Sequence, residues 1–205
     1  MMVARRKIRG FSMLEMMVVI AILLIASAIS AISIQPALKA ARVTAGYNTA
    51  LGVLRQARDN SIGQRQVFIV TFSNAAVPNT ITITQALTGN VLNTYPLPSD
   101  VLFTVVAGFP VSPVAFPVTP DGFGVGGTPI DFDQGIVGGV KNMIYFQPDG
   151  SAQDVNGAIN NGVVYITRAG DLSDARAITV WGATGRLRGW HLYTNAGGTY
   201  YWREQ

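Results

Sequence analysis

An uninterrupted apolar stretch close to the amino terminus is the feature that most limits how this chain can fold. Residues 16–34 contain no charged side chain, and as a helix with a rise of ~1.5 Å per residue they would be ~28 Å long. That length is close to the ~30 Å hydrocarbon core of a bilayer, so the sequence predicts a membrane-spanning helix. Three serines at three-residue spacing predict a polar seam that could face a partner helix: Ser27, Ser30 and Ser33.

Positive charge is concentrated immediately before this stretch. Four of the 15 Lys and Arg residues lie within residues 1–10: Arg5, Arg6, Lys7 and Arg9. By the positive-inside rule, they keep that end in the cytoplasm and direct the rest of the chain outward. Residues 11–205 contain 11 basic and 11 acidic side chains. This neutral balance argues against a general affinity of the whole domain for nucleic acid, despite the formal charge of +4.

The composition also limits the chemistry. Cysteine is absent and His191 is the single histidine, which excludes a disulfide scaffold, a thiolate metal site and a cysteine nucleophile. Little remains from which to build a zinc site or a serine–histidine couple. We therefore expect a protein that is not an enzyme and that uses no cofactor or metal. An apolar chain without thiols fits an extracytoplasmic protein that gains its stability from packing.

The amino-terminal segment has competing interpretations. A secretory signal peptide would explain the basic residues, the apolar stretch and the small residues at 26–28, but its apolar region usually spans only ~7–15 residues. A plain membrane anchor is the second interpretation. Neither explains Glu15, which lies where the apolar segment begins and is costly in hydrocarbon without a partner.

The segment Gly10-Phe11-Ser12-Met13-Leu14-Glu15, followed by the apolar helix, resembles the class III signal of type IV pilins and type II secretion pseudopilins. This resemblance implies that a membrane aspartyl (prepilin) peptidase cleaves between Gly10 and Phe11 and methylates the new amine of Phe11. It also implies a partner for Glu15, whose carboxylate would neutralise the terminal amine of a neighbouring subunit during assembly. Ser12 and Met13 depart mildly from the commonest residues at their positions.

Beyond the apolar stretch, the pattern changes from apolar on all sides to amphipathic. Pro36 is expected to kink or loosen the helix, and after it apolar residues recur at three- and four-residue spacing. We expect a cleaved leader at 1–10, a transmembrane and filament-core helix at 11–35, its amphipathic continuation at 36–65, and a β-rich domain at 66–205.

The β-rich domain consists of short runs separated by turn residues, such as those at 148–150 and 161–162. Strands are expected at 67–73, 80–85, 91–95, 101–106, 143–147, 163–168, 177–181, 186–193 and 199–202. One long helix followed by many short antiparallel strands predicts the α+β class, with the helix packed on an antiparallel sheet.

Residues 96–140 are rich in proline and glycine and predict a long irregular connection within the β-rich domain. Three aspartates lie on it: Asp121, Asp131 and Asp133. They could ligate calcium, but their spacing matches no EF-hand loop, so we expect them in solvated turns.

The order of segments in the carboxy-terminal third is similar to the β-domain of GspH/FimT-type minor pilins, and the resemblance covers roughly residues 11–72 and 141–190. It implies a pilin fold and a structural subunit of a type II secretion pseudopilus or a type IV pilus, placed near the filament tip. The implied partners are other pilins, the prepilin peptidase and an inner-membrane assembly platform. The implied location is the bacterial inner membrane, crossed once with the amino terminus cytoplasmic, and then a periplasmic or surface filament.

An alternative function is DNA capture for natural transformation. In the FimT-like branch, a Gly-Arg-x-Arg motif is associated with DNA, and it matches Gly185, Arg186 and Arg188. On a strand, both arginines and Trp190 would project from one face, where they could grip phosphates and stack on a base. The competing interpretation is a hairpin turn completed by Gly185. The arginines would then be solvated or paired with acidic residues, Asp171 or Asp174. The neutral charge balance favours this second interpretation.

Overall fold

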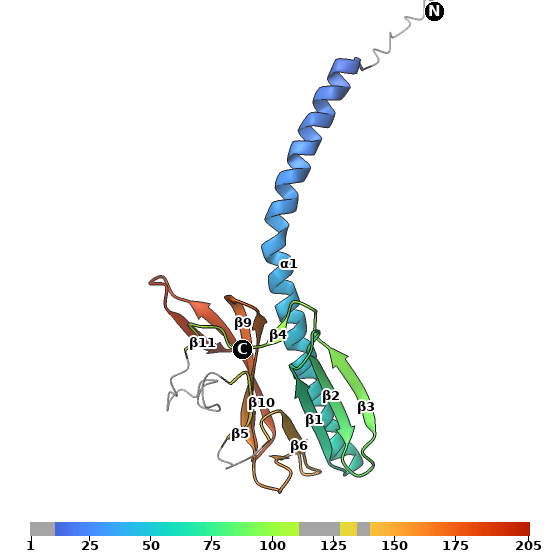
Figure 1. The fold of residues 1–205 in the computed structure, drawn as a ribbon, viewed down its shortest axis with the longest axis vertical. Coiled ribbons are helices and arrows are strands. Elements are labelled where there is room, and N and C mark those ends of the chain that lie inside the picture. Colours follow the sequence, from blue (N-terminus) through green and yellow to red (C-terminus); the bar gives the residue numbers. More distant parts are fainter. Residues whose placement is uncertain (1–10, 111–127, 135–139) are drawn as a thin grey trace, which may run out of the picture. The chain divides into compact units, whose positions relative to one another are not determined.

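The structure, a computed structural model, describes residues 11–110, 128–134 and 140–205 (Figure 1). The expected cleavage residue Gly10 and Asp121 lie outside these residues. The chain divides into two compact units, Met1–Lys39 and Ala40–Gln205.

A long helix, α1 (Met13–Gln64), begins the described chain and continues across Pro36. Arg65 follows it in the left-handed conformation, with φ 52°. The amide of Gln66 donates to the carbonyl of Ser61 (3.2 Å), which is the hydrogen bond of a Schellman motif. This cap satisfies a free carbonyl at the helix end and turns the chain into the first strand.

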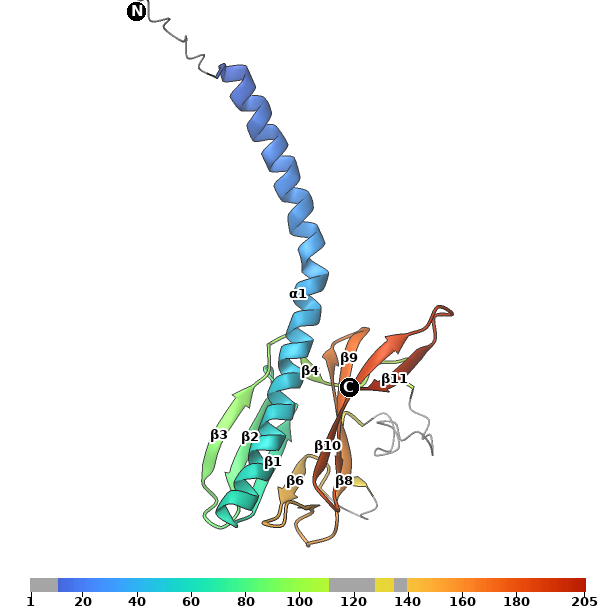
Figure 2. The same cartoon turned by 180° about the vertical axis from the view of Figure 1, so that it is seen from behind.

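The first sheet is antiparallel, and its strand β2 alternates threonine and isoleucine. Its strands, in spatial order, are β3 (Val91–Pro96), β2 (Thr80–Gln85), β1 (Phe68–Ser73), β6 (Met143–Phe146) and β7 (Ala152–Gln153). The sheet covers one side of the carboxy-terminal half of α1, which lies behind it in Figure 1 and in front of it in Figure 2.

The second sheet is also antiparallel. In spatial order it contains β11 (Tyr200–Glu204), β10 (Arg186–Thr194), β9 (Asp171–Trp181), β8 (Asn161–Arg168) and β4 (Leu102–Phe103), and β5 (Ile130–Gln134) pairs with β8 as well. Together with α1, the two sheets confirm the expected α+β, pilin-like architecture.

The main core lies between α1 and the two sheets. The helix contributes buried residues at three- and four-residue spacing, as expected for one packed face: Val43, Tyr47, Ala50, Leu54 and Ala57. The sheets contribute alternate residues of their strands, including Phe68, Val70, Phe72, Ile81, Ile83, Val164, Ile166, Ile178 and Val180. The core-facing surface of each sheet is thus set by its period-two pattern.

A second core covers the opposite face of the second sheet. Strand β8 is buried on both faces, because Val163 and Tyr165 point into this second core while their neighbours point into the main one. The ring of Phe109 lies 5.7 Å from that of Tyr165 and 5.5 Å from that of Trp202. Residues 105–109 therefore help to cover the sheet. Within the segment 96–140, the strand expected at 101–106 is present as the shorter β4. The segment was otherwise expected to be irregular, but it also supplies β5 and part of a core.

One predicted turn is wrong. Asn161 and Gly162 were expected to form a turn, but they begin β8. A β-carbon at Gly162 would overlap the backbone of Phe132 on β5. The glycine is therefore needed for the close approach of two strands, and its local turn preference is overridden by this packing.

Candidate functional site

The amino-terminal segment begins with a capped helix. The amide of Glu15 donates to Ser12 Oγ (3.2 Å), and the amide of Met16 donates to the Ser12 carbonyl (3.1 Å). Ser12 is therefore the N-cap, and its spacing from Glu15 is that of a capping box. The carboxylate of Glu15 lies in the first turn, where the helix dipole favours negative charge.

The side chains that the assembly hypothesis uses are exposed. Phe11 is 75% exposed, and Glu15 is exposed as well. Within the described residues, the Glu15 carboxylate makes no hydrogen bond or ion pair. The structure thus leaves this carboxylate open to a partner outside the chain.

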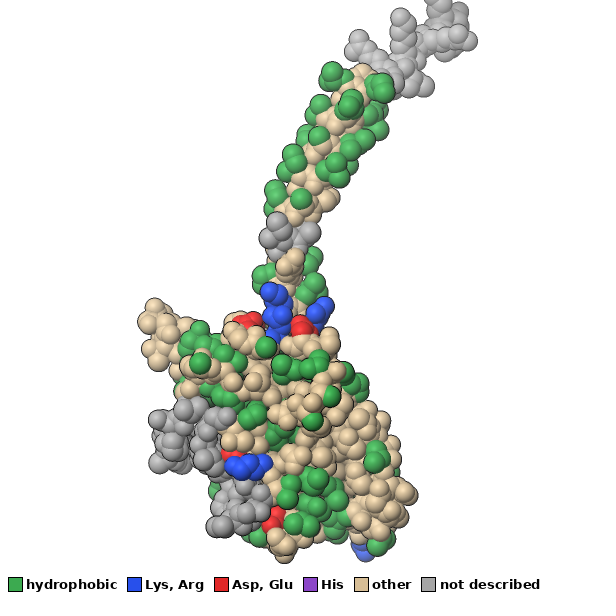
Figure 3. Space-filling view, in the orientation of Figure 1, with side chains coloured by type: hydrophobic (Ala, Val, Ile, Leu, Met, Phe, Trp, Pro, Cys, Tyr) green, Lys and Arg blue, Asp and Glu red, His purple; other side chains and the backbone are tan. Residues whose placement is uncertain are grey.

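Among the described residues of its unit, the apolar part of α1 also has no packing partner. An 18-residue window reaches a mean hydropathy of 2.8 with none of it buried, so the helix is long and apolar enough to cross a membrane. Figure 3 shows hydrophobic side chains along the visible face of this part of the helix. An apolar surface of this extent in water is unfavourable, which calls for lipid or neighbouring helices around it.

The three serines of the expected polar seam bond to their own helix. Ser27 Oγ donates to the Leu23 carbonyl (2.7 Å), and Ser30 Oγ donates to the Ala26 carbonyl (2.9 Å). Ser33 Oγ donates to the Ser30 carbonyl (3.0 Å). Each hydroxyl proton therefore has an acceptor without a partner helix, which lowers the cost of placing these residues in lipid.

The expected hairpin turn at Gly185 is confirmed. Gly185 has φ 60° and joins β9 to β10 after Thr184, whose amide donates to the Trp181 carbonyl (3.3 Å). A β-carbon at this position would overlap the carbonyl oxygen of Gly150. Both the conformation and the space therefore require glycine.

Expectations for the two arginines of the motif are partly wrong. Arg188 Nε lies 3.3 Å from Glu204 Oε1, so its partner is neither Asp171 nor Asp174. Instead, Asp171 Oδ2 lies 3.4 Å from Arg168 Nη1, and Asp174 Oδ1 lies 3.8 Å from His191 Nε2. Strand β11 brings Glu204 opposite β10, a long-range pairing that the local pattern did not indicate.

Trp190 cannot stack on a base as arranged here. It shares a face of β10 with Arg188, as expected, but that face is the second core, and Trp190 is only 3% exposed. Its Nε1 donates to Thr179 Oγ1 (3.0 Å). The exposed aromatic beside Arg186 is Trp181, its cross-strand neighbour, which is 48% exposed.

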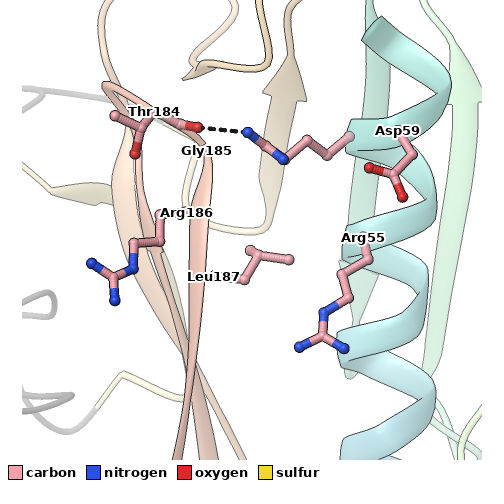
Figure 4. A pocket seen from close by; sticks show the side chains of 7 residues that line it. Arg55, Asp59, Thr184, Gly185, Arg186 and Leu187 are labelled. Carbon is pink, nitrogen blue, oxygen red and sulfur yellow. Dashed lines mark hydrogen bonds between the residues drawn. The ribbon is translucent and has the colours of Figure 1, made fainter. Parts of the chain in front are cut away.

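Arg58 joins α1 to two turns. Its Nε donates to the Gly150 carbonyl (3.2 Å), and its Nη2 donates to the Thr184 carbonyl (3.1 Å). Beside this clamp is a surface pocket of about 470 Å³, lined by Arg55, Arg58, Asp59, Thr184, Gly185, Arg186 and Leu187 (Figure 4). No local sequence signal could predict this pocket, because Arg58 and Thr184, which both line it, are 126 residues apart in the chain.

The aspartates of the proline- and glycine-rich segment do not form a metal site in the described part of the chain. Asp131 was expected in a solvated turn, but it lies on β5 with its side chain fully buried, and Lys141 Nζ is 3.3 Å from its Oδ1. Asp133 is on the same strand. Among the described residues, no three His, Asp or Glu side chains are grouped so that they could hold a metal ion.

The amino terminus is similar to a known family. Residues 5–31 match the family model of the prokaryotic N-terminal methylation motif. The motif indicates a prepilin-like chain that a peptidase processes. With the long helix packed on antiparallel sheets, it supports a type IV pilin-like protein. No curated protein and no solved structure matches the chain.

Proposed function

We propose that this chain is a minor pilin or pseudopilin, a non-catalytic subunit of a type II secretion pseudopilus or a type IV pilus. The observation that carries the proposal is the methylation motif at residues 5–31, directly followed by an apolar helix that is not buried in its own fold. Such a helix can be stored in the inner membrane and then transferred into the core of a filament. An assembly platform would extract it, and the β-rich domain would be exposed outside the membrane.

Glu15 would set the register of assembly. Its carboxylate is exposed in the first helical turn and has no partner within the described residues. After cleavage between Gly10 and Phe11, the methylated amine of a neighbouring subunit would provide a positive charge. In a medium of low dielectric constant, this pairing is far stronger than in water. A carboxylate left unpaired there is costly, so only one axial position of the incoming subunit is favourable.

Intact-mass measurement of the protein purified from membranes tests the proposal. We expect a chain that starts at Phe11 and carries one methyl group, and the unprocessed chain in cells that lack the prepilin peptidase. A product that starts between residues 27 and 31 would show cleavage by an ordinary signal peptidase, and the filament proposal would be abandoned.

DNA capture is a second candidate function, and one observation favours it. Arg186 is exposed and lies across the hairpin from exposed Trp181, so a guanidinium and an indole share one surface. The pairing of Arg188 with Glu204 and the burial of Trp190 weigh against it. DNA binding across a salt series should show a slope reduced by about one for each arginine removed in Arg186→Gln/Arg188→Gln. Absence of binding at low salt rejects this function.

A further inference from the structure

The pocket beside the β9–β10 turn carries more positive than negative charge. Three arginines and one aspartate line it, although residues 11–205 as a whole are neutral. Of these, the side chain of Arg186 extends from β10 on the side away from α1 (Figure 4). Two of these cations, Arg55 and Arg186, are exposed and make no hydrogen bond or ion pair within the described residues. The local excess of positive charge favours an anionic ligand.

The lining of the pocket indicates which kind of anion fits. Figure 4 shows the side chain of Arg55 extending from α1 toward β10, and that of Leu187 extending from β10 toward α1. Leu187 is partly buried against the main core and presents an apolar surface. A ligand that meets both residues needs one negative group next to one apolar group. An acidic residue beside an apolar residue in a polypeptide has this combination, and a guanidinium can bind its carboxylate through two parallel hydrogen bonds.

A nucleic-acid strand fits the same surface less well. Asp59 lies on the pocket wall, where it would repel a closely spaced row of phosphates. Nearby Arg188 is already paired with Glu204, so it does not extend the positive charge along β10. Binding of a polyanion depends on several phosphate contacts along the strand, whereas the positive charge here is confined to one pocket.

The walls of the pocket are held in place before any ligand arrives. Arg58 links α1 to the carbonyls of Gly150 and Thr184, and both Arg58 and Thr184 line the pocket. The left-handed conformation of Gly185 keeps the turn in contact with Gly150. A preformed site binds with a smaller loss of conformational freedom.

We propose that this pocket binds an acidic side chain of a partner polypeptide, with Arg55 receiving the carboxylate and Leu187 contacting the adjacent apolar residue. In the filament, that polypeptide would be a neighbouring subunit, and this identity of the partner rests on the proposed function. The binding itself does not depend on processing or on filament formation.

The test is a titration of the full-length, isotope-labelled chain in detergent micelles with acetyl-Leu-Glu-amide, followed by amide resonances. Saturable shifts are expected at Gly185 and Leu187. The neutral probe acetyl-Leu-Gln-amide should bind about tenfold more weakly, because it lacks the charge-assisted hydrogen bonds. Arg55→Gln should weaken binding of the acidic probe by a similar factor. Arg203→Gln, which removes an exposed arginine from β11, should leave binding unchanged.

Asp59→Asn supplies a test with the opposite sign. Removing this carboxylate should strengthen binding of the acidic probe, by about two- to threefold for an exposed charge. Equal binding of the two probes, wild-type binding by Arg55→Gln, or weaker binding by Asp59→Asn would each overturn the proposal. So would tighter binding of a short single-stranded oligonucleotide at the same resonances. A chain that is processed at Phe11 yet fails this titration would leave the filament function intact.

Discussion

The hydroxyl of Tyr47 occupies the space in which a β-carbon of residue 189 would lie. Tyr47 is on the buried face of α1, and Gly189 is in the middle of β10, so helix and strand are in direct contact at this point. Burial raises the pKa of Tyr47, while Arg176 and Arg55 act in the opposite direction. The phenol therefore remains neutral at physiological pH and fits this closely packed position.

Gly189→Ala should destabilise the domain. The added methyl group would overlap Tyr47 Oη, and the ring carbon Cζ would be only 2.9 Å away. Overpacking of this kind costs ~1–3 kcal/mol. Chemical denaturation of the full-length chain in micelles measures the change. Gly52→Ala is the matched control, because nothing lies within 4 Å of its added methyl group. That control should be more stable by ~0.5–1 kcal/mol, since alanine favours a helix. Changes of the same sign in both variants would contradict the packing described.

Arg58→Gln should loosen the two turns from α1. The shorter side chain cannot reach both the Gly150 and Thr184 carbonyls, and loss of hydrogen bonds to a charged group costs ~1.5–3 kcal/mol. Amide hydrogen exchange should rise first near residues 150 and 184. Arg203→Gln serves as the control for removing an arginine and should be nearly neutral. Unchanged exchange at both turns in Arg58→Gln would show that the clamp contributes nothing.

Stability should fall as the pH decreases through the range in which His191 titrates. Burial is the main cause that lowers the pKa of His191, and the charge of Arg176 adds to it, while Asp174 opposes both. In the unfolded chain the imidazole has its ordinary pKa of ~6.5, so below that pH the unfolded state binds the proton more readily. The stabilising contribution is present above pH ~6.5 and is lost as the pH falls toward the lower folded-state pKa.

Denaturation midpoints at roughly pH 7.5, 6.5 and 5.5 cover this range and measure the effect. His191→Gln should flatten the dependence, because His191 is the single histidine. An equal slope in the variant and the wild type would place the responsible group elsewhere.

Ser12→Ala should fray the start of α1. It removes the acceptor of the Glu15 amide and costs ~0.5–2 kcal/mol of helix stability. Faster hydrogen exchange of that amide in micelles is the expected result. Ser12→Thr keeps a hydroxyl at the cap and should exchange nearly as slowly as the wild type. Similar exchange in the alanine and threonine variants would argue against the cap.

Glu15→Ala separates membrane insertion from assembly. If the carboxylate pairs with a neighbour's amine, its removal should leave insertion and processing largely intact while incorporation into filaments is lost. Insertion should even become easier, because a carboxylate near hydrocarbon is unfavourable. Sheared-filament fractions probed for the variant provide the measurement. Normal incorporation would assign Glu15 a different partner.

The sequence predicted those elements whose pattern is local. The alternating threonines and isoleucines at 80–85 indicated β2 with the bounds that the structure has. Alternation also placed Arg188 and Trp190 on one face of β10. The DNA-capture interpretation needed Trp190 to be open on that face, and this was wrong, because residues 105–109 and Trp202 of the neighbouring strand pack in the same core as Trp190. Strand β5 was missed because Ile130 and Phe132 follow a proline- and glycine-rich segment, which obscured a short period-two pattern.

The candidate site likewise has features that the local sequence predicts and features that depend on tertiary packing. The spacing of Phe11 and Glu15 and the turn at Gly185 could be inferred from consecutive residues. The pocket could not, since Arg55 and Leu187 become neighbours only when the helix packs beside β10. The salt bridge of Arg188 likewise depends on strand pairing, because Glu204 is opposite Trp190 in the register of β10 and β11.

The hydroxyl groups of Ser27, Ser30 and Ser33 need no hydrogen-bond acceptor from outside α1. Because each proton is already donated to a carbonyl of the same helix, exchanging acyl chains for neighbouring subunits neither breaks nor requires a polar contact at these positions. At these three positions the two environments therefore do not differ in polar contacts. In the proposed filament, such a helix would pass between bilayer and filament core without a polar barrier along its apolar length, and the direction of transfer would be decided at its amino-terminal end, where Glu15 lies.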